Sequence, residues 1–409
     1  MTGASVNGGQ RKRIAIVAPE LGAHGGVQSV AWFLYRVIRD SGRYDVDAIS
    51  LAMSWRDPDS VRLLAPRTWL RSPRVTSRER DGLAFRHVGA VAPELERRRY
   101  RPRRALTELL EQYDLVQLVS GSPAIGHATE GLRVPVALQI ATTMRVERKR
   151  AVEMQPGFRG LMTRASTSHM ASFDEAGVTH ARLIFTENAW LHRELSERYP
   201  GRVRLAPPGI DTERYRPGAS PAWNGPILAV ARLNDPRKNL PMLFDAYARL
   251  RARMPQAPRL MLAGQFNLPA HEAAMPQQLG IAEHVDIRYS PTIEELIALY
   301  QSASCLALSS DEEGLGIVIL EAMASGLPVV ATGCGGPDDV VIEDGTGYLV
   351  PVKDAAAMAE RLAHVLSSAP LRARLGAAGR ERAVREYSIA AAGRRFLDAY
   401  DTLLEAAHA

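Results

Sequence analysis

The chain has 409 residues, more than one hydrophobic core usually serves, so two domains are expected. Hydrophobic residues make up 46% of the chain and charged residues 23%, an ordinary balance for a globular protein. No segment approaches the run of about 18 apolar residues that a membrane span needs, and the polar, then basic N-terminus lacks a signal-peptide cleavage pattern. These features predict a cytoplasmic protein.

The formal net charge of +6 comes from a strongly skewed set of basic residues. Only four are lysine, so 47 of the 51 basic residues are arginine, which indicates GC-rich bacterial coding better than selection for nucleic-acid binding. Basic clusters lie at 96–104 and 145–150. They are either a solvated surface or a patch for an anionic acceptor or an acidic membrane surface, so peripheral membrane association is possible.

The first half of the chain alternates apolar runs with amphipathic stretches. Strands are predicted at 13–20, 44–51, 115–121, 135–142 and 181–187, and helices at 25–42 and 103–114. The segment 207–226 is rich in proline and glycine and has no periodicity, so it is the predicted interdomain linker.

A second alternating set follows the linker. Strands are predicted at 227–233, 259–265, 285–290, 304–310, 328–332 and 347–351, with helices at 239–254, 292–303, 316–326 and through the tail. Alternation of this kind predicts an α/β protein with two Rossmann-like, doubly wound parallel-sheet domains facing a cleft. The predicted domains are 1–207 and 208–389, and a last helix is predicted at 390–409.

Two glutamates, Glu313 and Glu321, lie eight positions apart across a predicted helix start, and Gly314 and Gly316 follow the first. Eight residues at the helical rise span about 12 Å, farther than the ~5 to 9.5 Å of a glycosidase acid–base pair. The pair fits the two ends of one extended ligand better, because a carboxylate can accept from a vicinal diol. A nucleoside diphosphate sugar has a ribose at one end, a sugar at the other and a diphosphate between them.

Cations for a diphosphate are available before the next helix. Arg232 ends a predicted strand and Lys238, the one lysine between 150 and 352, follows six residues later. In the first domain, Gly25 and Gly26 open a helix, an arrangement that suits phosphate or a structural turn. The cysteines, Cys305 and Cys334, have no metal-ligand spacing, so neither a metal nor a disulfide framework is predicted.

At these residues the sequence resembles the GT-B glycosyltransferases of the glycogen-synthase and sucrose-synthase type (glycosyltransferase family 4). The segment 309–354 is similar to the family's E-x7-E element with its following glycine-rich loop, and "ARLNDPRKN" at 231–239 to its Arg…Lys-Asn pattern. The segments 24–42 and 205–217 resemble its N-terminal glycine loop and interdomain connector.

The resemblance implies metal-independent transfer from a nucleotide sugar, with retention at the anomeric carbon and no cofactor. It also implies that the last helix, 390–409, packs back on the first domain. It assigns diphosphate binding to Arg232 and Lys238, sugar hydroxyls to Glu313 and the ribose diol to Glu321. The remaining donor contacts that it implies are backbone contacts of Gly314, Leu315, Gly316, Gly335 and Gly336, with Gly25 and Gly26 approaching the phosphate from the other domain. Asp338 and Asp339 are interpreted as a loop and helix cap instead of a metal site.

The sequence departs from the family where many members carry a histidine after the strand that ends near 141. Thr142 and Thr143 stand there, and His24 and His127 are the histidines that remain as possible substrate contacts. The expected acceptor is a small molecule, a natural product or a lipid-linked saccharide, with no nucleic-acid partner. A sugar-nucleotide epimerase or phosphorylase of the same fold and a catalytically silent nucleotide-sugar binder are the alternatives; base, donor sugar, acceptor and oligomeric state stay open.

Overall fold

The chain divides into two compact units. The computed structural model describes residues 11–23, 25–80, 82–147, 157–219 and 224–406. The first unit comprises 1–186, 191–206 and 393–409, and the second comprises 187–190 and 207–392. The sequence placed the boundaries at 207/208 and 389/390 and did not anticipate the short excursion of 187–190.

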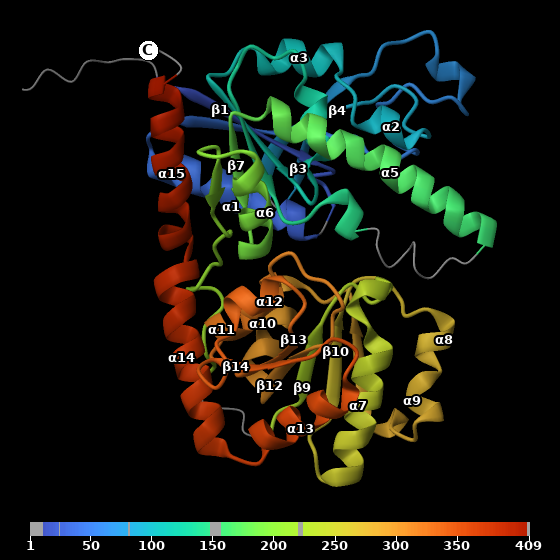
Figure 1. Ribbon diagram of the computed structural model, residues 1–409, viewed down its shortest axis with the longest axis vertical. Helices are drawn as coiled ribbons and strands as arrows, with labels where there is room; N and C mark the ends of the chain where they lie inside the picture. Colours follow the sequence, from blue (N-terminus) through green and yellow to red (C-terminus); the bar gives the residue numbers. More distant parts are fainter. Residues whose placement is uncertain (1–10, 24, 81, 148–156, 220–223, 407–409) are drawn as a thin grey trace, which may run out of the picture. The chain divides into compact units, whose positions relative to one another are not determined.

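The first unit is built on one eight-stranded sheet with the order β3-β4-β2-β1-β5-β6-β7-β8 (Figure 1). Its strands are β1 (Arg13–Pro19), β2 (Asp45–Leu51), β3 (Val75–Arg80), β4 (Leu83–Val88), β5 (Leu115–Ser120), β6 (Val136–Ile140), β7 (Leu183–Thr186) and β8 (Val203–Leu205). Pairing is parallel throughout except between β3 and β4. The strands β1, β5, β6 and β7 are close to fully buried, as expected where helices cover both faces of a parallel sheet.

Helices of the first unit flank this sheet. They are α1 (Gly26–Ser41), α2 (Glu96–Arg99), α3 (Arg104–Leu110), α5 (Gly157–His180), α6 (Ala189–Arg198) and most of α15 (Ile389–Ala406), with the 3-10 turns η1 (Pro66–Thr68) and η2 (Pro123–Thr129). Helix α1 is amphipathic and buries Val30, Phe33, Leu34, Val37 and Ile38.

The second unit is built on a six-stranded, all-parallel sheet with the order β11-β10-β9-β12-β13-β14. Its strands are β9 (Ile227–Val230), β10 (Leu260–Gly264), β11 (Val285–Tyr289), β12 (Cys305–Leu308), β13 (Val329–Thr332) and β14 (Gly347–Val350). Its helices are α7 (Leu240–Arg253), α8 (Ala270–Ala273), α9 (Met275–Gln278), α10 (Ile293–Ser302), α11 (Ile317–Ala324), α12 (Gly336–Val340), α13 (Ala355–Leu366) and α14 (Ala369–Tyr387), with turns η3 (Pro236–Lys238) and η4 (Ala282–His284).

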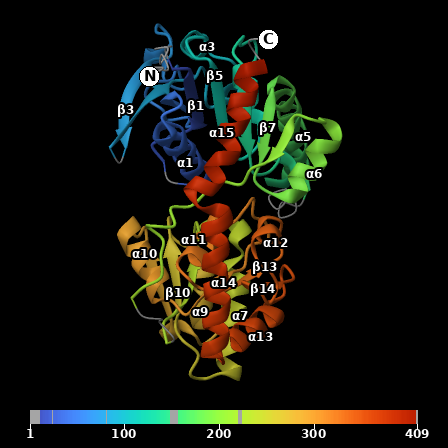
Figure 2. The same cartoon turned by 90° about the vertical axis from the view of Figure 1, so that its left-hand side faces the viewer.

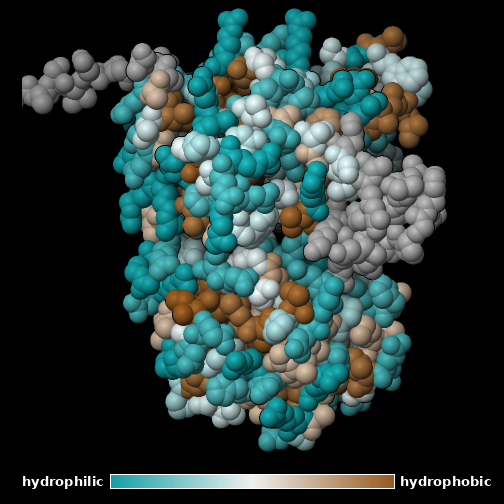
Figure 3. All heavy atoms as spheres, in the orientation of Figure 1, coloured by the Kyte–Doolittle hydropathy of each residue, from teal (hydrophilic) through white to brown (hydrophobic). Residues whose placement is uncertain are grey.

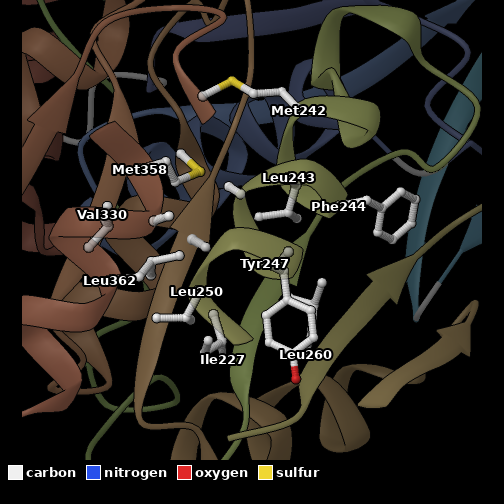
Figure 4. Packing of buried hydrophobic residues seen from close by; sticks show 14 of the residues in the cluster. Ile227, Met242, Leu243, Phe244, Tyr247, Leu250, Leu260, Val330, Met358 and Leu362 are labelled. Atoms are coloured by element: carbon white, nitrogen blue, oxygen red, sulfur yellow. The ribbon is translucent and has the colours of Figure 1, made fainter. Parts of the chain in front are cut away.

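One core cluster of the second unit lies between its sheet and helices α7 and α13, and another includes residues of α10, α11 and α14. Figure 4 shows Leu243, Tyr247 and Leu250 of α7 beside Ile227 of β9 and Leu362 of α13. The Tyr247 hydroxyl donates to the carbonyls of Pro258 and His284 at 2.9 and 3.2 Å, so this buried phenol keeps its hydrogen bonds.

The last helix crosses from one unit to the other along the chain. Figure 2 shows α14 and α15 in red, one after the other. The Phe396 ring of α15 lies 5.9 Å from that of Phe33 and 4.7 Å from that of Phe185, both in the first unit. Residues 393–406 therefore complete the core of the first unit.

The predicted α/β class with two doubly wound, parallel-sheet domains is confirmed. The antiparallel β3–β4 hairpin, where Arg80 pairs with Leu83, was not predicted, although the Asp-Gly pair at 81–82 is typical of a two-residue turn. Helices α5 and α6 and strand β8 were also missed, because their hydrophobic periodicity is weak or their length short. No helix among the described residues is long and apolar enough to cross a membrane.

Candidate functional site

Two loops meet at the carboxyl ends of the neighbouring strands β9 and β12. The Asp311 amide donates to the Arg237 carbonyl at 2.7 Å, and the Ser309 hydroxyl donates to the Lys238 carbonyl at 2.9 Å. The Asn239 side chain donates to Asp311 Oδ1 at 2.7 Å. Asn239 is also the N-cap residue of α7, with a left-handed φ of 46°. These bonds fix the backbone that carries Lys238 relative to the backbone that carries the first glutamate.

Lys238 and Glu313 form an ion pair at this junction. Lys238 Nζ lies 2.6 Å from Glu313 Oε1, and the side chains are only 16% and 11% exposed. The Ser310 hydroxyl donates to the same carboxylate oxygen at 2.6 Å. The Glu313 carboxylate is mostly buried and accepts from both the Lys238 ammonium group and the Ser310 hydroxyl. The two charged groups are therefore preorganised, because their positions are fixed before a ligand binds.

Arg232 lies on the same loop and is held by Asp235. Arg232 Nη2 is 2.6 Å from Asp235 Oδ2, and Arg237 donates from Nε and Nη2 to the two oxygens of Asp235 at 3.1 and 2.9 Å. Burial works to raise the pKa of Asp235, but the hydrogen bond from Arg237 and the charges of both arginines hold that pKa below its ordinary value. The Arg232 side chain is 47% exposed, so it remains accessible to an anion.

The glycine loop after Glu313 leads directly into α11. Gly316 has φ 83° and stands at the N-cap without a side-chain cap, so the first amides of the helix keep no side-chain partner from that residue. Leu315 between the glycines is buried at 3% exposure and anchors the loop in the core. An uncapped helix N-terminus beside cations favours an anionic group.

The second glycine loop, Gly335–Gly336, packs against the first. The Gly336 amide donates to the Glu313 carbonyl at 3.0 Å, and the Glu313 amide donates to the Cys334 carbonyl at 3.3 Å. A Cβ at Gly336 would lie 2.4 Å from Leu315 Cα, so no other residue fits there. Gly335, at φ 111°, donates its amide to Asp338 Oδ2 at 2.7 Å, which confirms the interpretation of Asp338 as a cap.

A segment distant in sequence joins these loops. Asn188 Nδ2 donates to the Gly314 carbonyl at 2.6 Å, and the Ala189 amide donates to Asp339 Oδ2 at 2.6 Å. A Cβ at Gly335 would lie 3.2 Å from the indole nitrogen of Trp190. Residues 187–190 therefore support both glycine loops, although no motif in the sequence indicated them.

Glu321 lies one and a half turns inside α11, apart from the Lys238–Glu313 pair. The Tyr300 hydroxyl donates to its Oε2 at 2.6 Å, and Tyr215 also hydrogen-bonds this carboxylate. Burial raises the pKa of Glu321 to about 7, against the opposing hydrogen bonds from the two tyrosines. The sequence indicated that Glu321 is an acid among apolar neighbours and needs hydrogen-bond donors. It did not indicate that Tyr300 and Tyr215 are those donors.

The predicted glycine pair of the first unit lies at the start of α1, directly after β1. Gly25 has an extended backbone (φ 165°) and no side-chain cap, and its carbonyl accepts from the Ser29 amide at 3.0 Å. Gly26 is the first residue of the helix. The geometry is that of a helix start with its first amides exposed, and the role of the pair stays a prediction.

The threonines that stand in place of the family's histidine have local structural roles. The Thr142 amide donates to the Gly121 carbonyl at 2.9 Å, and Thr142 is 6% exposed. The Thr143 hydroxyl accepts from the Val146 amide at 3.4 Å and begins the short helical turn after β6. His24 lies outside the described residues.

His127 lies in η2 with a glutamate and a second histidine. Its Nδ1 is 3.1 Å from Glu130 Oε2, and His180 Nε2 is 3.6 Å from Glu130 Oε1. Burial lowers the pKa of His127, although the charge of Glu130 acts to raise it. The structure brings together Arg232, Lys238, Glu313 and the two glycine loops within the second unit, whereas His127 belongs to the first unit.

Buried network residues elsewhere in the first unit were missed by sequence reasoning. Asp174 accepts from the Ala124 and Met144 amides at 3.0 and 2.6 Å, and burial raises the pKa of its carboxyl to about 6. His87 bridges Ser50 at 3.0 Å and Asp57 at 2.9 Å. These residues are far apart in sequence, so no local spacing announces them.

Two Rossmann-like units, with cations and a helix start at the carboxyl end of the second sheet, define the GT-B class of glycosyltransferase folds. Solved structures agree with this fold over nearly the whole chain. Sucrose-phosphate synthase from Thermosynechococcus elongatus superposes with a TM-score of 0.74 at 21% identity, covering 97% of this chain and all of that one. Anabaena HepE in complex with UDP and glucose gives a TM-score of 0.67 at 14% identity, covering 96% and 100%.

Residues 221–382, which lie in the second unit, match the model of the family "Glycosyl transferases group 1". D-inositol 3-phosphate glycosyltransferase of Salinispora tropica is 32% identical over 232 residues, which are 51% of this chain and 48% of that protein. GDP-mannose-dependent alpha-(1-6)-phosphatidylinositol monomannoside mannosyltransferase of Mycolicibacterium smegmatis is 32% identical over 208 residues, 47% and 54% of the two chains. The chain thus spans about half the length of the curated relatives it matches.

Proposed function

We propose that the protein is a retaining, metal-independent glycosyltransferase that moves a sugar from a nucleoside diphosphate sugar to a hydroxyl group. The acceptor would be a small molecule, a natural product or a lipid-linked saccharide. The observation that carries the proposal is the ion pair of Lys238 with Glu313, beside Arg232 and next to the uncapped start of α11.

Each group at this junction has a role in the proposed reaction. Arg232 and Lys238 bind the diphosphate and stabilise the negative charge that grows on it as the glycosidic bond breaks. Amides of the Gly314–Gly316 loop line the donor, together with the backbone of the Gly335–Gly336 loop that packs against it. Glu313 accepts from hydroxyls of the donor sugar, while Lys238 keeps its bond to Glu313 Oε1 and donates another of its three N–H groups to the phosphate oxygens.

The second glutamate serves the opposite end of the donor. Glu321 accepts from the ribose hydroxyls, held in position by Tyr300. An ionised carboxylate is the better acceptor, so a pKa near 7 means that donor affinity rises with pH until the group is ionised. The reaction in this form uses neither a metal ion nor an organic cofactor.

Donor binding and transfer are tested separately. A thermal-shift screen with UDP, GDP, dTDP and ADP identifies the base. The first donors to try are GDP-mannose, named for the M. smegmatis relative, and UDP-glucose, named for a further complex of HepE. D-inositol 3-phosphate is the first acceptor. Mass spectrometry of glycosylated products, with NMR of the anomeric carbon, reports transfer and stereochemistry.

Site variants test the two-ended assignment. Lys238→Gln is expected to lower transfer at least a hundredfold and to weaken nucleoside diphosphate binding. Glu313→Gln should lower transfer more than nucleoside diphosphate affinity, whereas Glu321→Ala should weaken nucleotide binding. The matched controls are Arg249→Gln on α7 and Glu381→Gln on α14, whose side chains are 56% and 75% exposed.

Equal affinity losses in the Glu313 and Glu321 variants would contradict the two-ended assignment. A chain that binds a nucleotide sugar but gives neither hydrolysis nor transfer would be the silent binder, the alternative favoured by Thr142 and Thr143 standing where a histidine is common. Epimerised donor without transfer would identify a sugar-nucleotide epimerase of the same fold.

A further inference from the structure

Exposed large apolar side chains are concentrated in one part of the first unit. Of the fifteen found among the described residues, eight lie between positions 55 and 95. Leu70 is fully exposed at 101%, Leu64 is 78% exposed and Trp69 is 58% exposed. Apolar groups that gather at one place on a surface mark an interaction site, whereas scattered ones do not.

The loop that carries these side chains has a defined structure. The Thr68 hydroxyl donates to the Ala65 carbonyl at 2.8 Å and accepts from the Arg62 amide at 2.9 Å. Trp69 Nε1 donates to the Arg62 carbonyl at 2.9 Å. The indole therefore has its polar group satisfied within the loop and can lose contact with water without leaving a donor unpaired.

A second segment lies beside this loop. Val61 and Val91 form a bridge, with the Ala92 amide donating to the Val61 carbonyl at 2.7 Å. The Leu64 amide donates to Glu94 Oε1 at 3.2 Å. These bonds place the exposed side chains of 63–70 next to those of 91–98. We call this the Trp69 surface, formed by Leu63, Leu64, Trp69, Leu70, Val91 and Leu95 with Arg67, Arg97 and Arg98.

The charge around the Trp69 surface is strongly positive. Residues 61–75 and 91–104 contain ten arginines and two glutamates, whereas the whole chain has a net charge of +6. One of those glutamates, Glu94, accepts from the Leu64 amide. Some arginines have structural roles, since Arg103 is buried and donates to the carbonyls of Val88 and Ala52. Arg67, Arg97 and Arg98 are exposed.

Figure 3 shows brown hydrophobic spheres directly beside teal hydrophilic ones at the upper right, over the loops drawn in blue in Figure 1. Leucine and tryptophan side chains that project among arginines are the combination that binds the interface of an anionic bilayer: the apolar groups enter the headgroup region and the guanidinium groups pair with phosphates.

We infer that the Trp69 surface docks the protein onto an anionic lipid bilayer. A second copy of the chain is a poorer occupant, because a two-fold contact would bring this excess of arginine against itself. The inference does not depend on the proposed reaction, since it concerns binding to lipid alone.

Vesicle binding tests the inference on the full chain. We expect sedimentation with vesicles of 30% phosphatidylglycerol in phosphatidylcholine, weak sedimentation with pure phosphatidylcholine, and loss of binding as sodium chloride rises from 0.1 to 0.5 M. Leu64→Ser with Leu70→Ser should weaken binding at least tenfold. Arg97→Gln with Arg98→Gln should weaken it about 25-fold, at about fivefold for each arginine.

The controls are exposed residues of the same kinds in the second unit. They are Ile342→Ser with Val384→Ser, which are 47% and 42% exposed, and Arg249→Gln with Arg385→Gln, which are 56% and 58% exposed. These variants should bind vesicles as the unmodified chain does, and circular dichroism melts should show that all variants fold.

Three results would overturn the inference. They are equal binding to neutral and anionic vesicles, equal binding by Trp69-surface variants and their controls, and a concentration-dependent dimer that the Leu64→Ser, Leu70→Ser variant abolishes while vesicles bind nothing. Tryptophan fluorescence gives an independent readout, since Trp69 should shift to the blue on vesicle addition and Trp69→Phe should remove most of that shift.

Discussion

Glu321 holds a carboxyl group in surroundings that favour its neutral form. It lies on α11 with the Tyr300 hydroxyl at 2.6 Å, and burial raises its pKa to about 7 from the ordinary value of 4.5. Between these two values the folded chain keeps a proton that the unfolded chain releases. The free energy of unfolding therefore falls as pH rises from about 4.5 to about 7. Above pH 7 Glu321 is ionised in both states, and the whole cost of burying its charge lowers the stability of the fold.

Glu321→Gln should remove this penalty. Glutamine keeps an oxygen that accepts from Tyr300 and carries no charge at any pH. The variant should be more stable than the unmodified chain at pH 8, by roughly 3 kcal/mol on the linkage relation, and nearly equal to it at pH 4.5. Urea unfolding between pH 4.5 and 8 measures the difference.

The control for that series is Glu381→Gln, since Glu381 is 75% exposed and pairs with Arg385 at the surface. Its difference from the unmodified chain should not change with pH over the same window. If Glu321→Gln were as insensitive to pH as Glu381→Gln, the carboxyl group would be ionised in the folded chain throughout, and its protonation would not limit nucleotide binding.

At the scale of elements, the site depends on two glycine loops that touch through their backbones. The Gly336 amide donates to the Glu313 carbonyl at 3.0 Å, and α12 begins at that residue directly behind β13. The position of Glu313 is therefore set by a neighbouring turn as well as by its own loop. A change in the packing of α12 must alter the Lys238–Glu313 pair.

Gly336→Ala should uncouple the two loops. The added Cβ would lie 2.4 Å from Leu315 Cα and 2.6 Å from the Gly314 carbonyl oxygen, both backbone atoms that cannot move aside alone. We expect a loss of about 1 to 3 kcal/mol in stability and at least a tenfold loss of nucleotide affinity. Calorimetric melts and nucleotide titrations measure the two effects.

Gly121→Ala is the matched control, because its Cβ would meet nothing within 4 Å. It should leave both the melt and the nucleotide titration unchanged. An unchanged affinity in Gly336→Ala, with the melt lowered as expected, would mean that the second loop supports the fold without positioning the donor.

Local patterns in the sequence were sufficient for most of these elements and for the loops of the site. Runs such as 227–230 and 305–308 are continuous apolar strands. Arg232 and Lys238 share the segment between β9 and α7, and Glu313 lies with its glycines between β12 and α11, so each group was recognisable within its own segment. The partners that complete the site come from elsewhere in the chain. Asn188 meets Gly314 across 126 positions, and Tyr300 meets Glu321 across 21. Such pairs are produced by tertiary packing and leave no periodic signal.

At the scale of the whole molecule, the chain returns to its first unit through α15. Tyr400 and Gln117 are both fully buried, and the Tyr400 hydroxyl donates to Gln117 Oε1 at 2.8 Å. Gln117 belongs to the central strand β5, and its side-chain amide group donates a hydrogen bond to the Leu118 carbonyl at 2.8 Å. One hydrogen bond thus connects the last helix to the middle of the first sheet, across 283 positions of the sequence.

Tyr400→Phe should weaken the first unit without affecting the second. The substitution keeps the ring packed against Phe185, 6.1 Å away between centroids, but leaves the buried Gln117 oxygen without its donor. The expected cost is about 1 to 3 kcal/mol, or about 2 to 4 °C per kcal/mol in the melting temperature of a unit of this size. Hydrogen exchange should be faster in 115–120 and 393–406 and unchanged in 227–230.

Tyr35→Phe, which keeps its ring beside Trp32 at the surface of α1, should change exchange in none of these segments. If Tyr400→Phe behaved in the same way, α15 would be held by its aromatic packing alone, and the hydroxyl would contribute nothing to joining the end of the chain to the first sheet.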